Sequence, residues 1–282
     1  MKKIAFWILL LQLPALCSGK VEERDEIRKV LHFAIPGAMN EIFVDNLNGS
    51  ISVTGTSGDA VQLSVEKTIQ ARSQAKIEQA RQDVTLEITE DQNRISLYVD
   101  GPFRNSKGEI NYRGSEYYGY EVFYEFELKV PYQTNLILKT INDGDISVEN
   151  TTENYELNNI NGSIRMLNVS GAGRVYALNG GVTVHFSQNP QGDSYYGSLN
   201  GQVHLYFHDP LEAEFRLKTF NGEVFSDFPM NYSNKNSIKK VKKNGKKIYK
   251  CERSFGVRAG NGGPEIELDA FNGDIFIHKH KK

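Results

Sequence analysis

Apolar and polar residues alternate over most of this chain, in short runs typical of β-strands with one buried face. Many of these runs flank a phrase made of an apolar residue, an asparagine and a glycine, as in "LNNINGSIRMLNV". The phrase occurs seven times, with an inserted aspartate in the copy "TINDGDISV". The apolar residues that open it are Leu47, Ile141, Ile160, Leu178, Leu199, Phe220 and Phe271.

The alternation changes parity at each phrase. Apolar residues tend to lie five and three places before the opening residue, and four and six places after it. A straight strand would expose half of such a set, so the chain must bend at the phrase. Because Asn and Gly adopt a positive φ at low cost, we expect these pairs to form corners between strands. The predicted corner residues are Asn48, Gly49, Asn161, Gly162, Asn179, Gly180, Asn200, Gly201, Asn221, Gly222, Asn272 and Gly273.

The spacing of the phrases predicts the architecture. From Ile141 to Phe220 they follow one another at intervals of roughly 20 residues, enough for two strands and two turns. Such a period favours an all-β chain whose two-strand coils stack as a β-solenoid or β-helix. Asn-Gly is also the commonest hairpin signal, so an antiparallel β-sandwich or meander is the alternative.

Two regions depart from the repeat. Residues 20–135 are predicted as a β-region with one short helix near 70–83, which could cap the open end of the stack; residues 136–282 form the Asn-Gly repeat region. In the first region, one parity of "YEVFYEFELKV" is expected to be core: Tyr120, Val122, Tyr124, Phe126, Leu128 and Val130. A lysine-rich hairpin is predicted near 235–252, where lysine mainly protects an exposed edge and could alternatively contact an anionic polymer.

The N-terminus is typical of a secretory signal peptide over residues 1–19, with Lys2 and Lys3 before an apolar run too short to span a membrane. The sequence therefore predicts an exported protein of the periplasm, the outer-membrane surface or the extracellular space. Cys17 is a possible but less favoured lipid anchor, because Leu16 stands where lipoprotein signals have a small residue. Cys251 would then be the one thiol of the mature chain, without a disulfide framework.

Composition and side-chain chemistry narrow the function. A formal charge of −2 lacks the basic surface that nucleic-acid binding needs. Tyrosines in the Gly-rich loop before the core strand are the candidate ligand-binding residues, since aromatic rings on a loop can stack on sugars. They are Tyr112, Tyr117 and Tyr118.

No pattern predicts a catalytic residue, a cofactor or a metal. His278 and His280 in "IHKHKK" are expected to belong to a solvated terminus, and Glu265, Glu267 and Asp269 to a wet strand face. The outward places after the phrases are not expected to form a catalytic constellation. Those places hold Ser52, Arg165, Thr183, His204, Phe225 and Phe276.

The order of "HFAIPGAMNEIFVDNLNGSISVTG", "YVDGPF", "VFYEFELKVP" and the serial phrases ending in "GGPEIELDAFNGDIFIHK" resembles the "putative adhesin" family of bacterial cell-envelope β-repeat proteins. The resemblance implies export and a β-repeat fold, and it supplies no catalytic residues. We therefore expect a non-enzymatic envelope or surface scaffold that binds a glycan or other polymer, or an envelope protein. The alternatives are a polysaccharide-acting enzyme on a β-helix and a small-ligand carrier.

Overall fold

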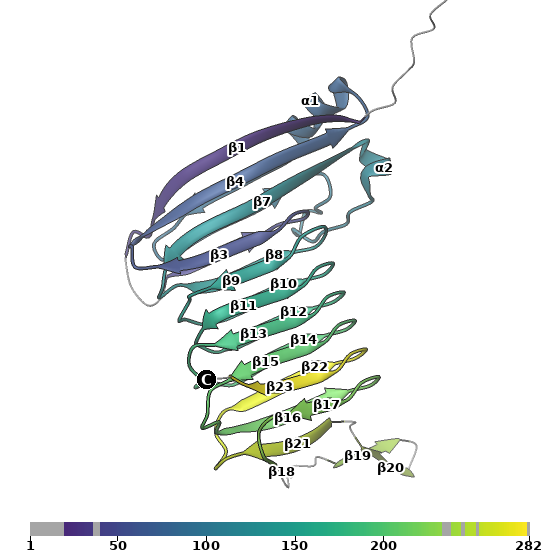
Figure 1. The fold of residues 1–282 in the computed structure, drawn as a ribbon. Coiled ribbons are helices and arrows are strands. Elements are labelled where there is room, and N and C mark those ends of the chain that lie inside the picture. Colours follow the sequence, from purple (N-terminus) through teal and green to yellow (C-terminus); the bar gives the residue numbers. More distant parts are fainter. Residues whose placement is uncertain (1–19, 36–39, 233–237, 244–245, 252–253, 281–282) are drawn as a thin grey trace, which may run out of the picture.

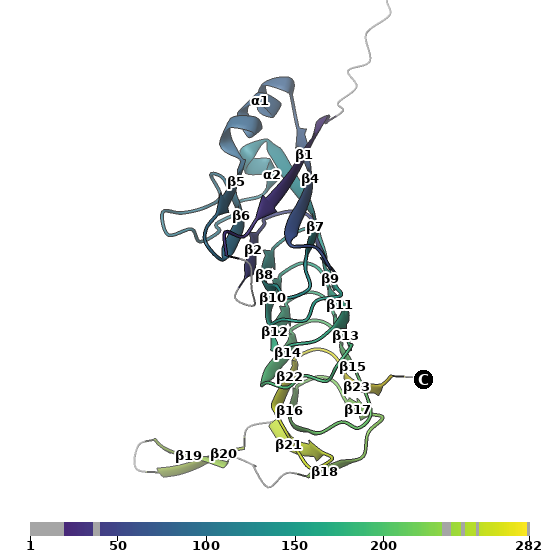
Figure 2. The same cartoon turned by 90° about the vertical axis from the view of Figure 1, so that its left-hand side faces the viewer.

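The computed structural model describes residues 20–35, 40–232, 238–243, 246–251 and 254–280. The predicted signal peptide and Cys17 lie outside these residues. Two long β-sheets run along a stack of coils and face each other across a continuous apolar core (Figures 1 and 2). We call them sheet A and sheet B.

Each coil contributes one strand to sheet B and the next to sheet A. The coils are β2 (Glu41–Asp45) with β3 (Ile51–Thr56), β8 (Asn135–Thr140) with β9 (Ile146–Glu149), β10 (Tyr155–Asn159) with β11 (Ile164–Val169), β12 (Gly173–Ala177) with β13 (Val182–Phe186), β14 (Ser194–Ser198) with β15 (Val203–Phe207), β16 (Ala213–Thr219) with β17 (Val224–Ser226), and β22 (Glu265–Ala270) with β23 (Ile275–Lys279). Neighbouring coils pair in parallel, for example β11 with β13 and β10 with β12. This confirms the β-solenoid and rules out an antiparallel meander for the stack.

The parity switch places both apolar sets of a phrase in the core. Leu157 before one phrase and Ile164 after it are each 1 % exposed, and Met166 is fully buried. The core strand β7 (Tyr120–Pro131) likewise buries every residue predicted for it. Between coils, the buried hydroxyls of Tyr155 and Tyr196 share a hydrogen bond of 2.6 Å, which satisfies both polar groups inside the apolar core.

The asparagines of the corners form a ladder along the stack. Each side-chain amide donates to the side-chain carbonyl of the corner Asn in the adjacent coil, as in Asn179 Nδ2 to Asn161 Oδ1 and Asn200 Nδ2 to Asn179 Oδ1, both 2.8 Å. The ladder runs through Asn48, Asn142, Asn161, Asn179, Asn200, Asn272 and Asn221. Asparagine is needed because its amide both donates and accepts.

The predicted reason for glycine at the corners is wrong at all but one position. Among the predicted corner glycines, Gly49 alone has a positive φ, 109°. At Gly180, a Cβ would lie 2.2 Å from the backbone oxygen of Gly162 in the adjacent coil, and Gly201 meets Gly180 in the same way. Glycine is therefore required by the close approach of one corner backbone to the next.

The last coil is out of sequence order. The spacing implied that the coils of Leu199 and Phe220 are neighbours, but the C-terminal coil lies between them. Its strand β22 pairs in parallel with both β14 and β16, and β23 pairs with both β15 and β17. The chain completes β16 and β17 first and then returns to fill the gap (Figure 1).

Additional strands extend the sheets at the N-terminal end. Sheet A is extended by β1 (Val21–His32), β4 (Ala60–Ala71) and β7, and sheet B by β5 (Thr85–Glu90) and β6 (Arg94–Asp100). The predicted helix is α1 (Gln74–Asp83), which starts after the N-cap Ser73 and buries Ile77 and Ala80. A four-residue helix, α2 (Ser115–Tyr118), was not predicted. Both sheets continue across the boundary predicted near residue 135.

At the other end, antiparallel strands β18 (Met230–Tyr232) and β21 (Ser254–Ala259) extend sheet B beyond β16. Between β18 and β21 lies the predicted lysine-rich hairpin, formed by β19 (Ile238–Lys243) and β20 (Lys246–Cys251). In the part of the chain that the structure describes, no helix is long and apolar enough to cross a membrane.

Candidate binding surface

Aromatic side chains cover the outer face of sheet A at the C-terminal coils. His204, Phe276 and Phe225 occupy the same register position on β15, β23 and β17. Their rings stack, with centroids 4.4 Å apart between His204 and Phe276 and 4.9 Å apart between Phe276 and Phe225. The planes deviate from parallel by 5° and 12°, so these side chains form one column along the stack.

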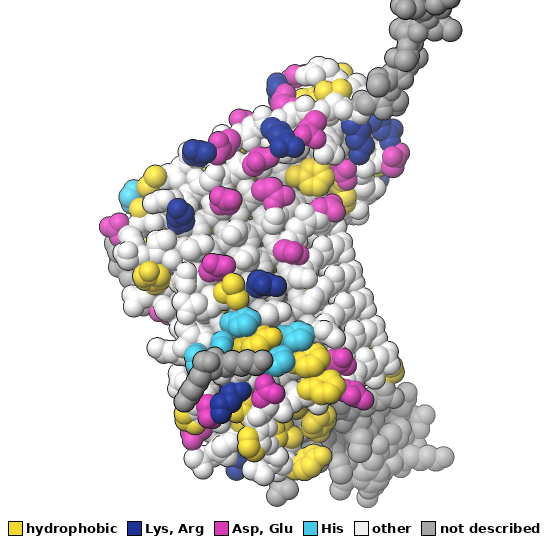
Figure 3. Space-filling model, viewed as in Figure 1, with side chains coloured by type: hydrophobic (Ala, Val, Ile, Leu, Met, Phe, Trp, Pro, Cys, Tyr) yellow, Lys and Arg dark blue, Asp and Glu magenta, His cyan; other side chains and the backbone are white. Residues whose placement is uncertain are grey.

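Two further columns lie beside the first. His185, Tyr206 and His278 stack at centroid distances of 3.9 and 4.4 Å, and His208 stacks on His280 at 4.4 Å. Figure 3 shows these histidine and apolar side chains gathered on one face. We call the eight residues of the three columns the ring array. It contains five of the six histidines of the chain.

The stacking decides which parts of the rings are available. Each ring covers the face of its neighbour in the adjacent coil, so the array presents mainly ring edges outward. Ring edges carry the positive end of the aromatic quadrupole. Phe225, at the end of its column, is 44 % exposed. The array is therefore suited to polar and negative groups along its length and to face stacking at its end.

Hydrogen bonds between the columns fix the imidazoles. His204 Nδ1 and His278 Nε2 are 3.1 Å apart, a distance at which one nitrogen must donate and the other accept. The Nε2 atoms of His208 and His280 both lie within hydrogen-bond distance of the carbonyl oxygen of Phe186, at 2.8 and 3.0 Å. The contact between these two nitrogens holds one proton. A proton on both nitrogens at once would break the hydrogen bond.

Burial sets the protonation of the array. Desolvation lowers the pKa of His185, and the neighbouring His280 and Arg165 lower it further. Desolvation followed by repulsion from His278 lowers the pKa of His204, which Asp274 partly offsets. The pKa of His280 is also lowered, first by burial and then by His208. These three imidazoles are consequently neutral at pH 7 and charge only below their usual range.

Charged groups lie at the rim of the array. Arg165 precedes it on β11, and Asp227 Oδ2 is 3.7 Å from His278 Nδ1. Lys279 Nζ is 2.5 Å from Asp209 Oδ2. The rim therefore holds both signs of charge, and the net charge of the array depends on its histidines.

The sequence pattern does not predict this surface. His278 and His280 were expected in a solvated terminus, but they lie half-buried in the array. His204, Phe225 and Phe276 were identified as outward residues without recognising that they stack. The sequence feature that could have revealed the stacking is their shared position after the Asn-Gly phrase. Parallel pairing brings residues at that position side by side in a column. Among the described residues, no group of three or more His, Cys, Asp or Glu is arranged to hold a metal ion.

The predicted tyrosine site does come together. Tyr118 lies 5.8 Å from the ring of Tyr112 and 5.0 Å from that of Tyr117, between ring centroids. Burial raises the pKa of Tyr112 to about 12, with Glu121 adding to the effect. Tyr117 is 63 % exposed, and Arg113 lies over its ring. Tyr112 and Tyr118 thus pack on the core, and Tyr117 is the ring of this loop that remains open to a ligand.

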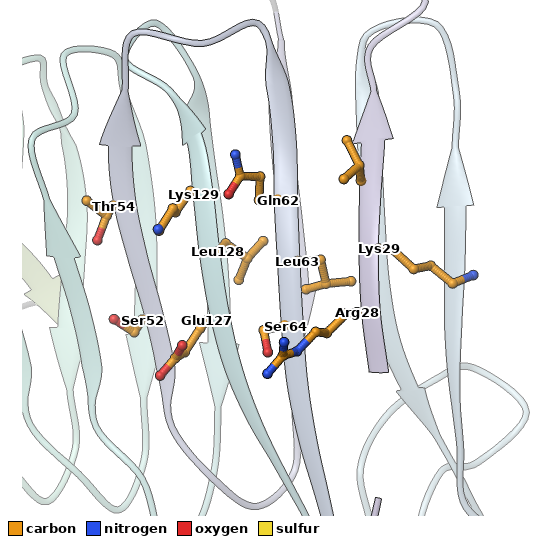
Figure 4. A pocket seen from close by; sticks show the side chains of 11 residues that line it. Arg28, Lys29, Ser52, Thr54, Gln62, Leu63, Ser64, Glu127, Leu128 and Lys129 are labelled. Atoms are coloured by element: carbon orange, nitrogen blue, oxygen red, sulfur yellow. The ribbon is translucent and has the colours of Figure 1, made fainter. Parts of the chain in front are cut away.

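A shallow hollow of about 600 Å³ lies on sheet A near the N-terminal end, over β1, β4, β7 and β3 (Figure 4). Its outward lining is mostly polar and includes Ser52, Ser64, Glu127 and Lys129. Ser52 pairs with Ser147, which pairs with Arg165, so the register that carries the first ring column continues into the hollow. The hollow and the array therefore belong to one continuous face.

The comparisons identify the family. The model of the family described as Toastrack DUF4097 matches residues 32–256. The chain belongs to this family. A search of curated proteins gives no match.

Two solved structures are similar to this member of the Toastrack family. One is a "putative cell adhesion protein" from Clostridium sporogenes, with a TM-score of 0.43 and 9 % identity, covering 92 % of this chain and 100 % of that one. The other is a "putative lipid binding protein" from Parabacteroides distasonis, with a TM-score of 0.30 and 13 % identity, covering 92 % of this chain and 97 % of that one.

Proposed function

We propose that this Toastrack protein is an exported, non-enzymatic scaffold of the cell envelope that binds an extended polymer or protein across the outer face of sheet A. The signal peptide predicted for residues 1–19 and the resemblance to envelope adhesins support the location. The observation that supports the binding role is the ring array, a half-exposed aromatic surface on a flat parallel sheet. Solenoids present extended faces of this kind to long ligands, and half-exposed aromatic patches on monomers mark binding sites more often than chance.

Side-chain pairing on sheet B argues against catalysis by two of its carboxylates. Asp269 Oδ2 accepts a hydrogen bond of 2.6 Å from Lys218, and Glu214 lies 2.5 Å from Arg258. Carboxylates tied to neighbouring cations are poor candidates for a general acid, which needs a pKa raised towards neutrality. A polysaccharide-acting enzyme would instead need two free carboxylates facing one bond.

The proposal is tested by binding the purified chain to immobilised glycans and to envelope fractions. A Tyr206→Ala, Phe276→Ala variant removes two members of the array, and a Tyr117→Ala, Tyr118→Ala variant removes the alternative site. We expect saturable binding that the array variant weakens about tenfold or more and that the loop variant retains. Equal binding by the array variant, no binding to any fraction, or release of reducing ends from a glycan would contradict the proposal.

A further inference from the structure

The chemistry of the ring array narrows the ligand, and this inference rests on the proposed function. We propose that the array is a binding site for a carboxylate-bearing polysaccharide, held by the edges of the imidazoles, and that binding strengthens as the histidines take up protons. The ligand class follows from three features of the surface.

First, the array offers few ring faces to a neutral sugar. The faces of Phe276, Tyr206 and His204 are covered by rings of adjacent coils, at centroid distances of 3.9 to 4.9 Å. Their edges are left for the ligand, and protonation of His204 would break its hydrogen bond to His278 and add an N–H donor. Such donors suit carboxylate oxygens, and hydrogen bonds to ionised groups are the stronger ones.

Second, the charge of the array is adjustable. Among the described residues, the charged groups that face its histidines are Arg165 from β11, Asp227 after β17, Asp274 before β23, and the Lys279 and Asp209 pair. Arg165 is the cation of this set that acts on His185, and the carboxylate of Asp274 favours protonation of His204. An anion placed over the array would add to that effect, so ligand and protons bind cooperatively.

Third, the geometry suits a polysaccharide more than a peptide. Peptides that bind β-proteins mostly add to a sheet edge, whereas β13, β15 and β23 are interior strands of sheet A. Within a column, one ring follows another at each coil, about every 4.8 Å, which is close to the length of one pyranose unit. A chain running along the stack could therefore bring one carboxylate to each coil.

The test is an equilibrium binding titration of the purified chain with polygalacturonate, neutral dextran and polyglutamate at pH 7.5 and pH 5.5. The array variant is His204→Gln with His278→Gln. The matched control is His32→Gln, which changes the sixth histidine, on β1 at the opposite edge of sheet A from β17. Thermal unfolding shows whether the array variant is folded. If it is not, a second array pair, His185→Gln with His280→Gln, takes its place.

We expect polygalacturonate to bind about tenfold more tightly at pH 5.5 than at pH 7.5 in the wild type and in His32→Gln, and the gain to disappear in an array pair. Lysine has an ordinary pKa of about 10.4, well above this range, so titration of histidine is the source expected for that gain. The inference is wrong if affinity does not change with pH, if the array pairs retain the gain, or if dextran or polyglutamate binds as well. Array-dependent binding of dextran would leave the proposed function intact, whereas no array-dependent binding of any ligand would contradict both.

Discussion

At the scale of single residues, each corner needs two things: an amide side chain that forms hydrogen bonds, and a following residue without a Cβ. Asparagine supplies an amide that joins adjacent coils through a ladder of hydrogen bonds, and such repeated ladders stabilise stacked parallel strands. Glycine leaves room for the backbone of the adjacent coil. The residue after Asn179 has no room for a Cβ because the backbone of the adjacent coil lies against it.

Replacing Gly180 by alanine tests whether the close approach of the coils requires glycine at the corner. The added Cβ would meet the backbone oxygen of Gly162 at 2.2 Å, and backbone cannot move aside without separating the coils. We expect a loss of about 2 kcal/mol or more in the free energy of unfolding, measured by urea denaturation. Gly58→Ala is the control, because its Cβ would have Thr56 Oγ1 at 3.9 Å as its nearest neighbour and should change stability by less than about 0.5 kcal/mol. Equal effects of the two substitutions would refute the close-approach explanation.

The array predicts a pH dependence of stability. Burial lowers the pKa of His185, His204 and His280 in the folded chain, so below about pH 6.5 the unfolded chain binds more protons than the folded one. Stability is therefore complete above that pH and decreases as the pH falls through it. We expect the melting temperature without ligand to drop by several degrees between pH 7.5 and pH 5.5. A flat profile, or an unchanged drop when the three residues are replaced by glutamine, would show that the array does not titrate in this way.

At the scale of elements, the C-terminal coil links the stack. Its strands β22 and β23 are paired on both sides, so they join the coil of β14 and β15 to the end coil of β16 and β17. Stability in a solenoid is carried mainly by contacts between neighbours. Loss of this coil would remove two such interfaces at once.

Deletion of residues 260–282 is therefore expected to unfold β16 and β17 and to lower the melting temperature by about 10 °C or more. The measurement is thermal unfolding followed by circular dichroism, with replacement of residues 238–251 by a short Gly-Ser linker as the control. The hairpin pairs only with itself among the described strands, so its removal should leave the melting temperature almost unchanged. An unchanged melting temperature of the truncated chain would show that the C-terminal coil does not link the stack.

The sequence predicted the repeating element well and its arrangement less well. Alternation and the parity switch at residues such as Ile160 identified strands, corners and the inward set, because period-two burial is a local property. The place of the Phe271 coil could not be read from spacing, since β-pairing between coils is non-local. The tyrosine loop was found from its composition, whereas the ring array needed the register that brings His204 beside Phe276.

At the scale of the whole molecule, the two faces of the stack differ in character. Sheet B carries outward carboxylates, Glu265, Glu267 and Asp269, and neighbouring cations that pair with some of them. Sheet A carries a polar hollow near one end and the ring array near the other, joined by a common register (Figures 3 and 4). A long ligand lying along sheet A would contact both, which makes that face the functional side of the solenoid.

The assignment of sheet A as the binding face is tested most directly by hydrogen-deuterium exchange of the full chain, with and without a saturating ligand from the binding screen. If sheet A is the binding face, exchange should slow in peptides covering β13, β15 and β23, with weaker protection near Ser52 and Ser64. Strands β5 and β6 of sheet B should exchange as before. Protection confined to the loop of Tyr112 to Tyr118, or to sheet B, would contradict the assignment of the outer face of sheet A as the site of binding.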